Sequence, residues 1–236
     1  MADSTSSSGA QPKGQPTLHH LSDSQSQRIL WLLEELAIPY TLINYKRDEQ
    51  KRSPPGLKTI HPLGRAPTFI TADGRILTES MTIATYLLET YDVSKKFAYS
   101  DWIRDMTLTS FSGTSLLDLA DTELLFDLAA KHTPWPLSYI TRFIKKKYDS
   151  FFSAAEFKKN MEFLAKELGD EEWFNGKEPG RADFMLSWPM DFVGQRGYVD
   201  LKKDFPTLHA WRMRIIERPA WKSTLEKGNG YDLNSW

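Results

Sequence analysis

The stretch between Ile60 and Tyr91 constrains the fold more than any other part of the chain. Ala66-Pro67 opens a short apolar run, Asp73-Gly74 gives a turn signal, and Glu79-Ser80 begins an amphipathic pattern. This order predicts a strand, a hairpin, a second strand and a helix. Proline removes a backbone donor, and a cis peptide bond before it would turn the polar groups of the preceding residue outward. A carboxylate, a hydroxyl and the free N–H groups of a helix start follow, so the stretch is suited to holding a small peptide.

The residues before this stretch alternate between strand-like and helix-like patterns. An apolar strand pattern precedes apolar residues at helical spacing, which stop before Pro39, and a second alternating segment follows. The whole order is β-α-β followed by β-β-α, which puts parallel and antiparallel pairs into one small sheet. We expect strands at Thr17–Leu21, at Tyr40–Tyr45, from Pro67 and at Arg75–Thr78, helices from Ser24 and from Ser80, and a charged loop at Lys46–Pro55.

After Tyr91 the chain has the pattern of helices interrupted by prolines and glycines. Residues 1–16 are rich in Ser, Gly, Gln and Pro and lack the apolar surface that offsets chain entropy, so we expect a disordered tail. The predicted fold class is therefore α/β plus all-α. Its parts are a small α/β domain at 17–92, a linker at 93–100 and an all-helical domain at 101–236.

Composition excludes several classes of function. The chain has 236 residues, no cysteine and a formal net charge of −1. Without cysteine there are no disulfides, thiolate metal sites or protein thiol nucleophiles, and the near-neutral charge gives no general attraction to nucleic acid. The five histidines form no HExxH motif, so we expect no metal. A secretory h-region and a membrane-length apolar run are also missing, so we expect a soluble cytoplasmic protein.

The run Lys145-Lys146-Lys147 lies among Phe143, Tyr148, Phe151 and Phe152. Basic and aromatic residues together can bind nucleic acid. These aromatic residues fall on one face at helical spacing, however. We therefore interpret the segment as a helix with a charged outer face over a packed inner face.

Four motifs, taken in their order and spacing, point to one known family. They are Ser24–Leu36, His61–Pro67, Thr78-Glu79-Ser80 and Arg181-Ala182-Asp183. The chain resembles the cytosolic glutathione transferases from Thr17 to about Met213. Its amino-acid sequence at Tyr45–Asp48 and Leu57–Arg65 most resembles the fungal class typified by yeast glutathione transferase I. The resemblance implies a thioredoxin-like N-terminal domain at 17–92, an all-helical domain for the second substrate, glutathione as co-substrate and a homodimer.

The resemblance places the catalytic serine of serine-type members at Ser24, four residues before Arg28. A hydroxyl is too weak a base to take the proton of a thiol, whose pKa is about 8.5 in model compounds, but it can donate a hydrogen bond to the thiolate. A helix N-terminus also favours the anion. Ser22 and Ser26 are close alternatives, and any of the three could instead be a simple N-cap.

The same resemblance assigns the ends of glutathione to further residues. Ala66 would pair its backbone with the cysteinyl part, before a cis Pro67; a trans proline opening an edge strand is the alternative. Glu79 would bind the γ-glutamyl ammonium, and Ser80 with the helix N–H groups would bind the neighbouring carboxylate; an ordinary N-cap is the alternative.

The glycyl carboxylate of glutathione needs a cation. In the loop before Pro67, Lys58 is the first candidate and Arg52 the second, with His61 behind them. For each of them, a solvated loop charge is the competing interpretation.

The helical domain would supply an apolar pocket for the electrophile. Phe111, Ser115 and Tyr139 are the candidates, with Leu116 and Trp188 as further ones, although aromatic residues at helical spacing more often pack in a core.

Asp183 matches the buried helix-capping aspartate of the family, a folding residue. Gly180 stands where the family usually has Ser or Thr, so we expect a helix start weaker by about a few tenths of a kcal/mol.

The leading hypothesis is a serine-type glutathione transferase that presents the thiolate to apolar electrophiles, with roles in detoxification and stress response. Reduction of organic hydroperoxides would use the same thiolate. The absence of cysteine argues against the thiol-transferase branch. The alternatives are a non-catalytic scaffold or regulator with this fold, and a carrier of apolar ligands. The presence of Ser24, Glu79 and Ser80 favours the enzyme.

Overall fold

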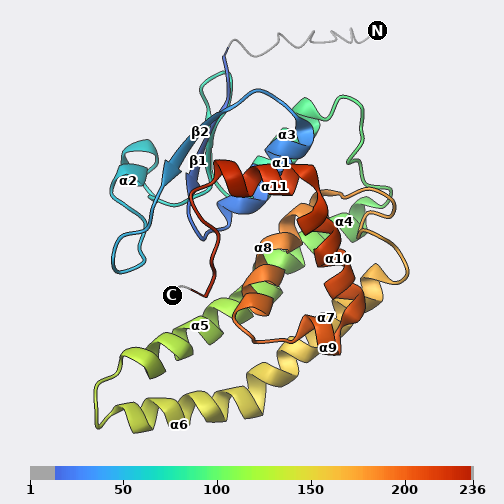
Figure 1. Cartoon of the computed structure of the whole chain (residues 1–236). Helices are drawn as coiled ribbons and strands as arrows, with labels where there is room; N and C mark the ends of the chain where they lie inside the picture. Colours follow the sequence, from blue (N-terminus) through green and yellow to red (C-terminus); the bar gives the residue numbers. More distant parts are fainter. Residues whose placement is uncertain (1–13, 235–236) are drawn as a thin grey trace, which may run out of the picture.

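The computed structural model describes residues 14–234, and its first part is built on a mixed sheet (Figure 1). Within these residues the strand order is β2-β1-β3-β4. β1 is parallel to β2 and antiparallel to β3, and β3 is antiparallel to β4. The β-α-β then β-β-α order predicts this mixture of pairings. The strands are β1 Thr17–Leu21, β2 Thr41–Tyr45, β3 Thr68–Ile70 and β4 Ile76–Leu77.

Helix α1, Ser26–Leu36, is buried along most of its length. It lies between the sheet and two later helices, α8 (Arg181–Gln195) and α11 (Pro219–Lys227). The ring centre of Trp31 is 4.5 Å from that of Phe184 in α8 and 5.8 Å from that of Trp221 in α11. Because aromatic side chains bury the most area, these contacts join the two halves of the chain in one core.

The remaining helices confirm the all-helical second part (Figure 1). Two π-helical turns, Ser112–Leu116 and Asp149–Ser153, join α4 to α5 and α6 to α7. Of the elements before Tyr91, only the five-residue helix α2 was not predicted. The helices are α2 Gly56–Ile60, α3 Ser80–Tyr91, α4 Trp102–Phe111, α5 Leu117–His132, α6 Ser138–Tyr148, α7 Ala154–Leu168, α9 Leu201–Asp204 and α10 Pro206–Glu217.

The start of α8 is organised by Asp183, as predicted. Its buried carboxylate accepts from the N–H groups of Phe174 and Gly180 at 2.9 and 2.8 Å and from the indole N–H of Trp211 at 2.8 Å. The Ser or Thr that the family usually has at position 180 would be crowded by a neighbouring side chain here. A Cβ on Gly180 would lie 2.6 Å from the Cβ of Asn175, so a larger residue would require Asn175 to shift.

Helices α5 and α6 form a hairpin that projects from the body of the molecule (Figure 1). The interpretation of α6 as a charged outer face over a packed inner face is wrong. Lys145 points inward and forms ion pairs with Glu123 and Asp127 of α5, whereas Phe143 is 61% exposed. The inward face of α6 therefore combines the ion pairs of Lys145 with the stacked rings of Tyr148 and Phe126 of α5, whose centres are 4.3 Å apart.

Two segment boundaries differ from the sequence prediction. Residues 1–13 of the expected tail lie outside the described residues. Pro16 is buried, and its carbonyl accepts from the N–H of Thr41 at 2.8 Å, so it belongs to the folded part. The expected linker at 93–100 is fastened at its start, because Asp92 accepts from the N–H groups of Lys96 and Phe97 at 2.9 and 2.8 Å.

Across residues 14–234, no helix combines the length and the apolar character needed to cross a lipid bilayer.

Candidate functional site

The sheet register brings the predicted site residues to one end of the strands, beyond the end of β1, the start of β3 and the end of β4. This end is called the sheet edge below. Phe69 of β3 pairs with Leu18 on one side and with Leu77 on the other. When these registers are continued, Ala66-Pro67 lies beside the end of β1, and Glu79-Ser80 lies beside Pro67. The peptide bond between Ala66 and Pro67 is cis, as the family resemblance implies. The turn that follows β1 and holds Ser24 therefore lies at the same end of the sheet as the proline and the start of α3.

The turn between β1 and α1 contains Ser22 and Ser24, and the first residue of α1 is Ser26; all three serines are buried. The hydroxyl of Ser24 donates to the carbonyl of Leu21 at 2.8 Å and lies 2.7 Å from the hydroxyl of Ser26. The first residue of α1 is Ser26, two positions later than the predicted start. Ser24 therefore sits just before the N-terminus of a helix, where the partial positive charge of the helix favours an anion.

Arg47 stabilises this turn through hydrogen bonds that the sequence analysis did not predict. Its guanidinium donates to the carbonyls of Ser22 and Asp23 at 3.2 and 3.1 Å. The C-terminal segment adds a second tie, because the N–H of Asp232 donates to the carboxylate of Asp23 at 2.7 Å. Both contacts join residues far apart in the sequence, so no local pattern could have indicated them.

Arg28 places a buried positive charge under the turn. Its guanidinium donates to the carbonyl of Met185 at 2.9 Å and to the side chain of Gln25. Burial lowers the pKa of Arg28 to about 10, and the nearby groups Tyr231 and Glu79 oppose that effect. Arg28 is therefore still protonated at neutral pH, and its charge favours an anion at this edge of the sheet.

Glu79 adopts an unusual backbone conformation directly before α3. Its φ is +64° and its ψ is +117°, in a region of backbone conformation that residues other than glycine rarely adopt. Such a conformation costs about 1 to 3 kcal/mol and is concentrated at functional sites. The carboxylate of Glu79 is exposed, whereas Ser80, the first residue of α3, is buried.

The two candidate cations for the glycyl carboxylate have different surroundings. Arg52 is held within its own loop, where it donates to Gln50 at 3.0 Å and lies 3.4 Å from the carboxylate of Asp48. Lys58, on α2, makes no ion pair within the described part of the chain. Its aliphatic stem crosses Gly64, where an added Cβ would lie 2.5 Å from the Lys58 Cγ. Lys58 is therefore directed toward the turn that leads into Ala66.

Two of the three pocket candidates share a cavity. Phe111 and Ser115 line a cavity of about 510 Å³. Tyr139 is not part of it, because its side chain is 69% exposed on α6. Leu116 and Trp188 are buried core residues. The other lining residues all belong to the helical part: Asp118, Leu119, Thr122, Tyr148, Phe152, Glu156, Lys159 and Asn160.

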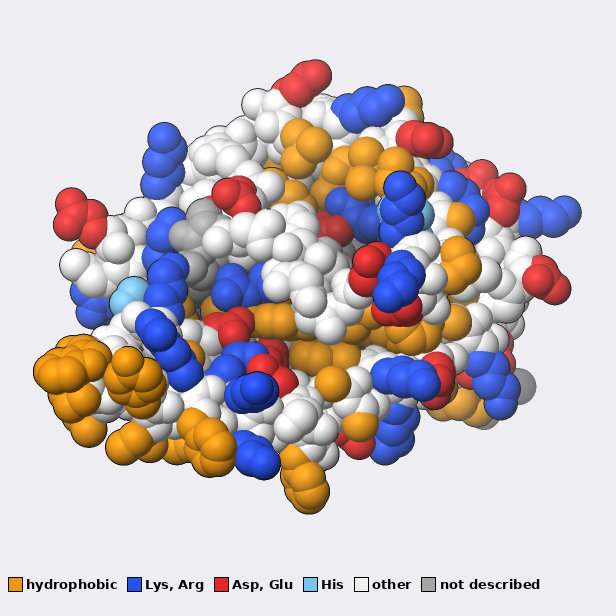
Figure 2. Space-filling model, turned by 60° about the horizontal axis from the view of Figure 1, so that its bottom comes forward, with side chains coloured by type: hydrophobic (Ala, Val, Ile, Leu, Met, Phe, Trp, Pro, Cys, Tyr) orange, Lys and Arg blue, Asp and Glu red, His pale blue; other side chains and the backbone are white. Residues whose placement is uncertain are grey.

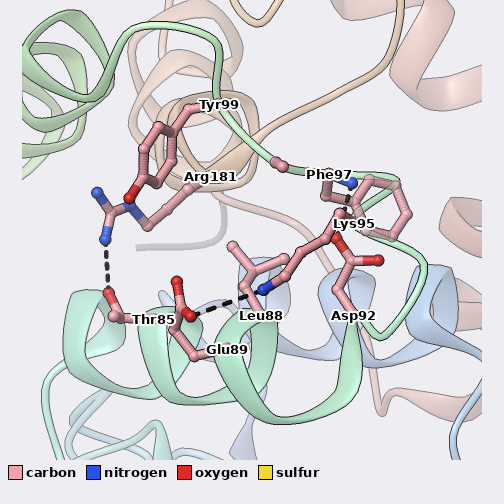
Figure 3. A pocket seen from close by; sticks show the side chains of 9 residues that line it. Thr85, Leu88, Glu89, Asp92, Lys95, Phe97, Tyr99 and Arg181 are labelled. Atoms are coloured by element: carbon pink, nitrogen blue, oxygen red, sulfur yellow. Dashed lines mark hydrogen bonds and ion pairs between the residues drawn. The ribbon is translucent and has the colours of Figure 1, made fainter.

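A second cavity, of about 310 Å³, lies between α3 and the segment that follows it (Figure 3). Arg181 at its edge donates to the hydroxyl of Thr85 at 2.8 Å and to the carboxylate of Asp105 at 2.9 Å. Across it, Lys95 lies 3.7 Å from Glu89. None of the predicted site residues lines this cavity. Arg181 of α8 links α3 and α4 through its contacts with Thr85 and Asp105.

Among residues 14–234, no three His, Asp or Glu side chains are grouped in a way that could hold a metal ion.

Comparison with known proteins places the chain in a family. The model of the glutathione S-transferase N-terminal domain matches residues 24–90, and that of the C-terminal domain matches residues 129–219. Glutathione S-transferase 1 of Saccharomyces cerevisiae is 30% identical, over 92% of this chain and 97% of the relative. Glutathione S-transferase 3 of Schizosaccharomyces pombe is 31% identical, over 89% and 86%. With the thioredoxin-like sheet and the helical second domain, these matches define the class. The chain belongs to the glutathione S-transferase family.

Solved structures show the same fold. A glutathione S-transferase from Actinobacillus pleuropneumoniae has a TM-score of 0.72 and 28% identity, over 94% of this chain and 97% of the other. The glutathione transferase URE2P8 of Phanerochaete chrysosporium, solved with oxidized glutathione, has a TM-score of 0.71 and 22% identity, over 92% and 96%. The second likeness concerns the fold alone.

Proposed function

We propose that the chain is a serine-type glutathione transferase that binds glutathione at the sheet edge where Ser24, Pro67 and Glu79 meet. The observation that carries this proposal is the register of β1, β3 and β4, which gathers three separate motifs at one place. The buried charge of Arg28 and the strained backbone of Glu79 at the same edge support it.

Each end of glutathione has a partner of suitable chemistry. The backbone of Ala66, before the cis Pro67, would pair with the cysteinyl residue. The exposed carboxylate of Glu79 would bind the γ-glutamyl ammonium, and the hydroxyl of Ser80 with the first N–H groups of α3 would bind the carboxylate beside it. For the glycyl carboxylate, Lys58 is favoured over Arg52, because Arg52 is already paired with Asp48.

Ser24 would stabilise the thiolate without acting as a base. The thiol proton leaves to water, and the Ser24 hydroxyl donates a hydrogen bond to the sulfur that remains. The sulfur then attacks an electrophilic carbon, and in a substitution the leaving group departs with its bonding electrons. The thiolate could equally attack the terminal oxygen of an organic hydroperoxide, which breaks the O–O bond, releases the alcohol after protonation and leaves the sulfur as a sulfenic acid. A second glutathione thiol would then attack that sulfur, release water and leave glutathione disulfide.

The homodimer expected of the family also has a candidate surface. The outer face of α6 and the loop before it carry exposed apolar side chains, among them Trp135 at 78% and Phe143 at 61% exposure. Figure 2 shows hydrophobic side chains gathered at the outer end of this hairpin. A second copy of the chain would remove this surface from water.

A carrier of apolar ligands is the second candidate function. The observation behind it is the cavity of about 510 Å³ that Phe111 and Ser115 line, which includes no residue of the sheet edge; the aromatic rings of Phe111, Tyr148 and Phe152 in its lining lie among charged and polar side chains. A carrier would bind apolar dyes there and show no turnover with glutathione.

Calorimetric titration with glutathione tests the proposed site. We expect saturable binding in the micromolar to low millimolar range, strongly weakened in Glu79→Ala. Turnover is then measured with 1-chloro-2,4-dinitrobenzene, because Ure2p5 of Phanerochaete chrysosporium was crystallised with 1-(S-glutathionyl)-2,4-dinitrobenzene. Ser24→Ala should lose turnover by about tenfold or more while its glutathione affinity stays nearly constant. Absence of glutathione binding would overturn the proposal, and dye binding without turnover would favour the carrier.

A further inference from the structure

Three buried side chains form a continuous series of hydrogen-bond contacts behind the proposed catalytic hydroxyl. The Nδ1 of His20 lies 2.9 Å from the Oγ of Ser26, which lies 2.7 Å from the Oγ of Ser24. His20 and Ser26 are fully buried, and Ser24 is 5% exposed. The series therefore runs from the core beneath α1 to the turn at the sheet edge.

The carbonyl of Leu21 lies within hydrogen-bond distance of both serine hydroxyls, 2.8 Å from that of Ser24 and 3.1 Å from that of Ser26. Because a hydroxyl has one hydrogen and the Ser24 contact with this carbonyl is the shorter, the arrangement in which Ser24 takes the carbonyl leaves the hydrogen of Ser26 for the contact between the two hydroxyls. The contact between Ser26 and His20 then uses a hydrogen on the Nδ1 of His20. In this arrangement each of these groups donates toward Ser24.

The far side of the His20 ring supports this tautomer. Its Nε2 is buried and has no hydrogen-bond partner among residues 14–234, and a Cβ on Gly228 would lie 3.4 Å from it. A hydrogen on Nε2 would leave a buried N–H unsatisfied, which is rarer in proteins than an unsatisfied acceptor. Burial lowers the pKa of His20 to about 4, so the ring is neutral at pH 7 and cannot take up the thiol proton.

We propose that His20 and Ser26 are positioning residues for the reaction: His20 donates to Ser26, Ser26 donates to Ser24, and the Ser24 hydrogen is left for the sulfur of glutathione. This inference rests on the proposed function of Ser24. When glutathione binds, the Ser24 hydrogen turns from the Leu21 carbonyl to the sulfur. The N–H of Ser26, 3.2 Å from the Ser24 oxygen, also holds that oxygen in place. Hydrogen bonds accepted by Ser24 polarise its own O–H and make it a stronger donor.

The test is a pH titration of the absorbance of bound glutathione thiolate at saturating glutathione, with the whole chain. Ser26→Ala and His20→Phe should raise the pKa of the bound thiol by about 0.3 to 1, as expected for one neutral hydrogen bond. kcat/KM at about pH 6.5 should fall about two- to tenfold and should match the wild-type chain at high pH, where glutathione is ionised in all variants. Glutathione affinity should change by less than about twofold.

Two variants separate positioning from folding. His20→Asn places an amide N–H near the position of Nδ1 and should restore most of the lost activity. His19→Phe is the matched control, because His19 is a buried neighbour whose Nδ1 contacts the hydroxyl of Tyr45 at 3.0 Å, away from Ser24. It should leave the pKa of the bound thiol unchanged.

A double-variant cycle gives the deciding result. Because His20 acts only through Ser24, Ser24→Ala combined with His20→Phe should have the same thiol pKa as Ser24→Ala alone. If Ser24→Ala raises this pKa while His20→Phe and Ser26→Ala do not, or if the two effects add in full, the inference is overturned and the proposed function stands. If Ser24→Ala has no effect on it, both fail.

Discussion

At the residue scale, His20 is a buried base whose protonation is linked to folding. Burial lowers its pKa from 6.5 to about 4, so below pH 6.5 the unfolded chain binds a proton more readily than the folded chain does. The stability that neutral His20 contributes is present above pH 6.5 and is lost as pH falls toward 4. Between about pH 7 and about pH 5 this loss is about 2 kcal/mol. Denaturant unfolding should show a smaller fall over this range in His20→Phe. Parallel curves for the two proteins would contradict a neutral, buried His20.

Glu79 has a strained backbone conformation and carries a carboxylate at the sheet edge. Glu79→Ala should keep the strained φ of +64° and lose the carboxylate. Glu79→Gly should lose the carboxylate but relieve the strain, so its free energy of unfolding should exceed that of Glu79→Ala by about 1 kcal/mol. Calorimetry should find that both variants bind glutathione about tenfold more weakly or worse. Wild-type affinity in either variant would remove Glu79 from the site.

At the scale of elements, α8 shows how a neighbour overrides a capping preference. Serine usually caps a helix better than glycine, but a side chain at position 180 meets Asn175. Gly180→Ser should therefore lower the free energy of unfolding by about 1 to 3 kcal/mol. Adding Asn175→Gly should recover part of that loss. A Gly180→Ser protein that is as stable as the wild-type chain would show that Asn175 moves aside freely.

The sequence predicted most of the N-terminal elements because their apolar periods are clear. Thr17–Leu21 is a strand with those bounds, and the turn at Asp73-Gly74 lies where expected. Helix α2 was missed because five residues are too short to show a helical period. The inward turn of Lys145 was missed because its ion partners, such as Glu123, lie on another helix, and periodicity does not reveal partners.

The candidate site was predictable in part for the same reason. Ser24, Pro67 and Glu79 belong to local motifs, so the sequence could name them; their roles remain proposals. Arg47 and His20 act through contacts with the serine turn that depend on tertiary structure. No sequence spacing rule links Arg47 or His20 to the serine turn.

At the scale of the whole molecule, the apolar face of α6 predicts an assembly. Light scattering should give about twice the mass of one chain, because a homodimer would cover this face. The double variant Tyr139→Glu and Phe143→Glu should be monomeric, since it places two charges at the contact. Leu225→Glu is the matched control, because Leu225 is 46% exposed on α11, and it should remain dimeric. A wild-type chain that is monomeric at high concentration would contradict the prediction.

In the proposed reaction the two domains act together: the sheet edge stabilises the glutathione thiolate, and the helical domain holds the electrophile that the thiolate attacks. The most direct test is the pKa of the glutathione thiol when bound, followed by thiolate absorbance in the wild-type chain and in Ser24→Ala. We expect a pKa well below the value of about 8.5 for a free thiol in the wild-type chain, and a clear rise in Ser24→Ala at unchanged glutathione affinity. The same pKa in both proteins, or a wild-type value equal to that of free glutathione, would contradict the proposal that Ser24 stabilises the bound thiolate.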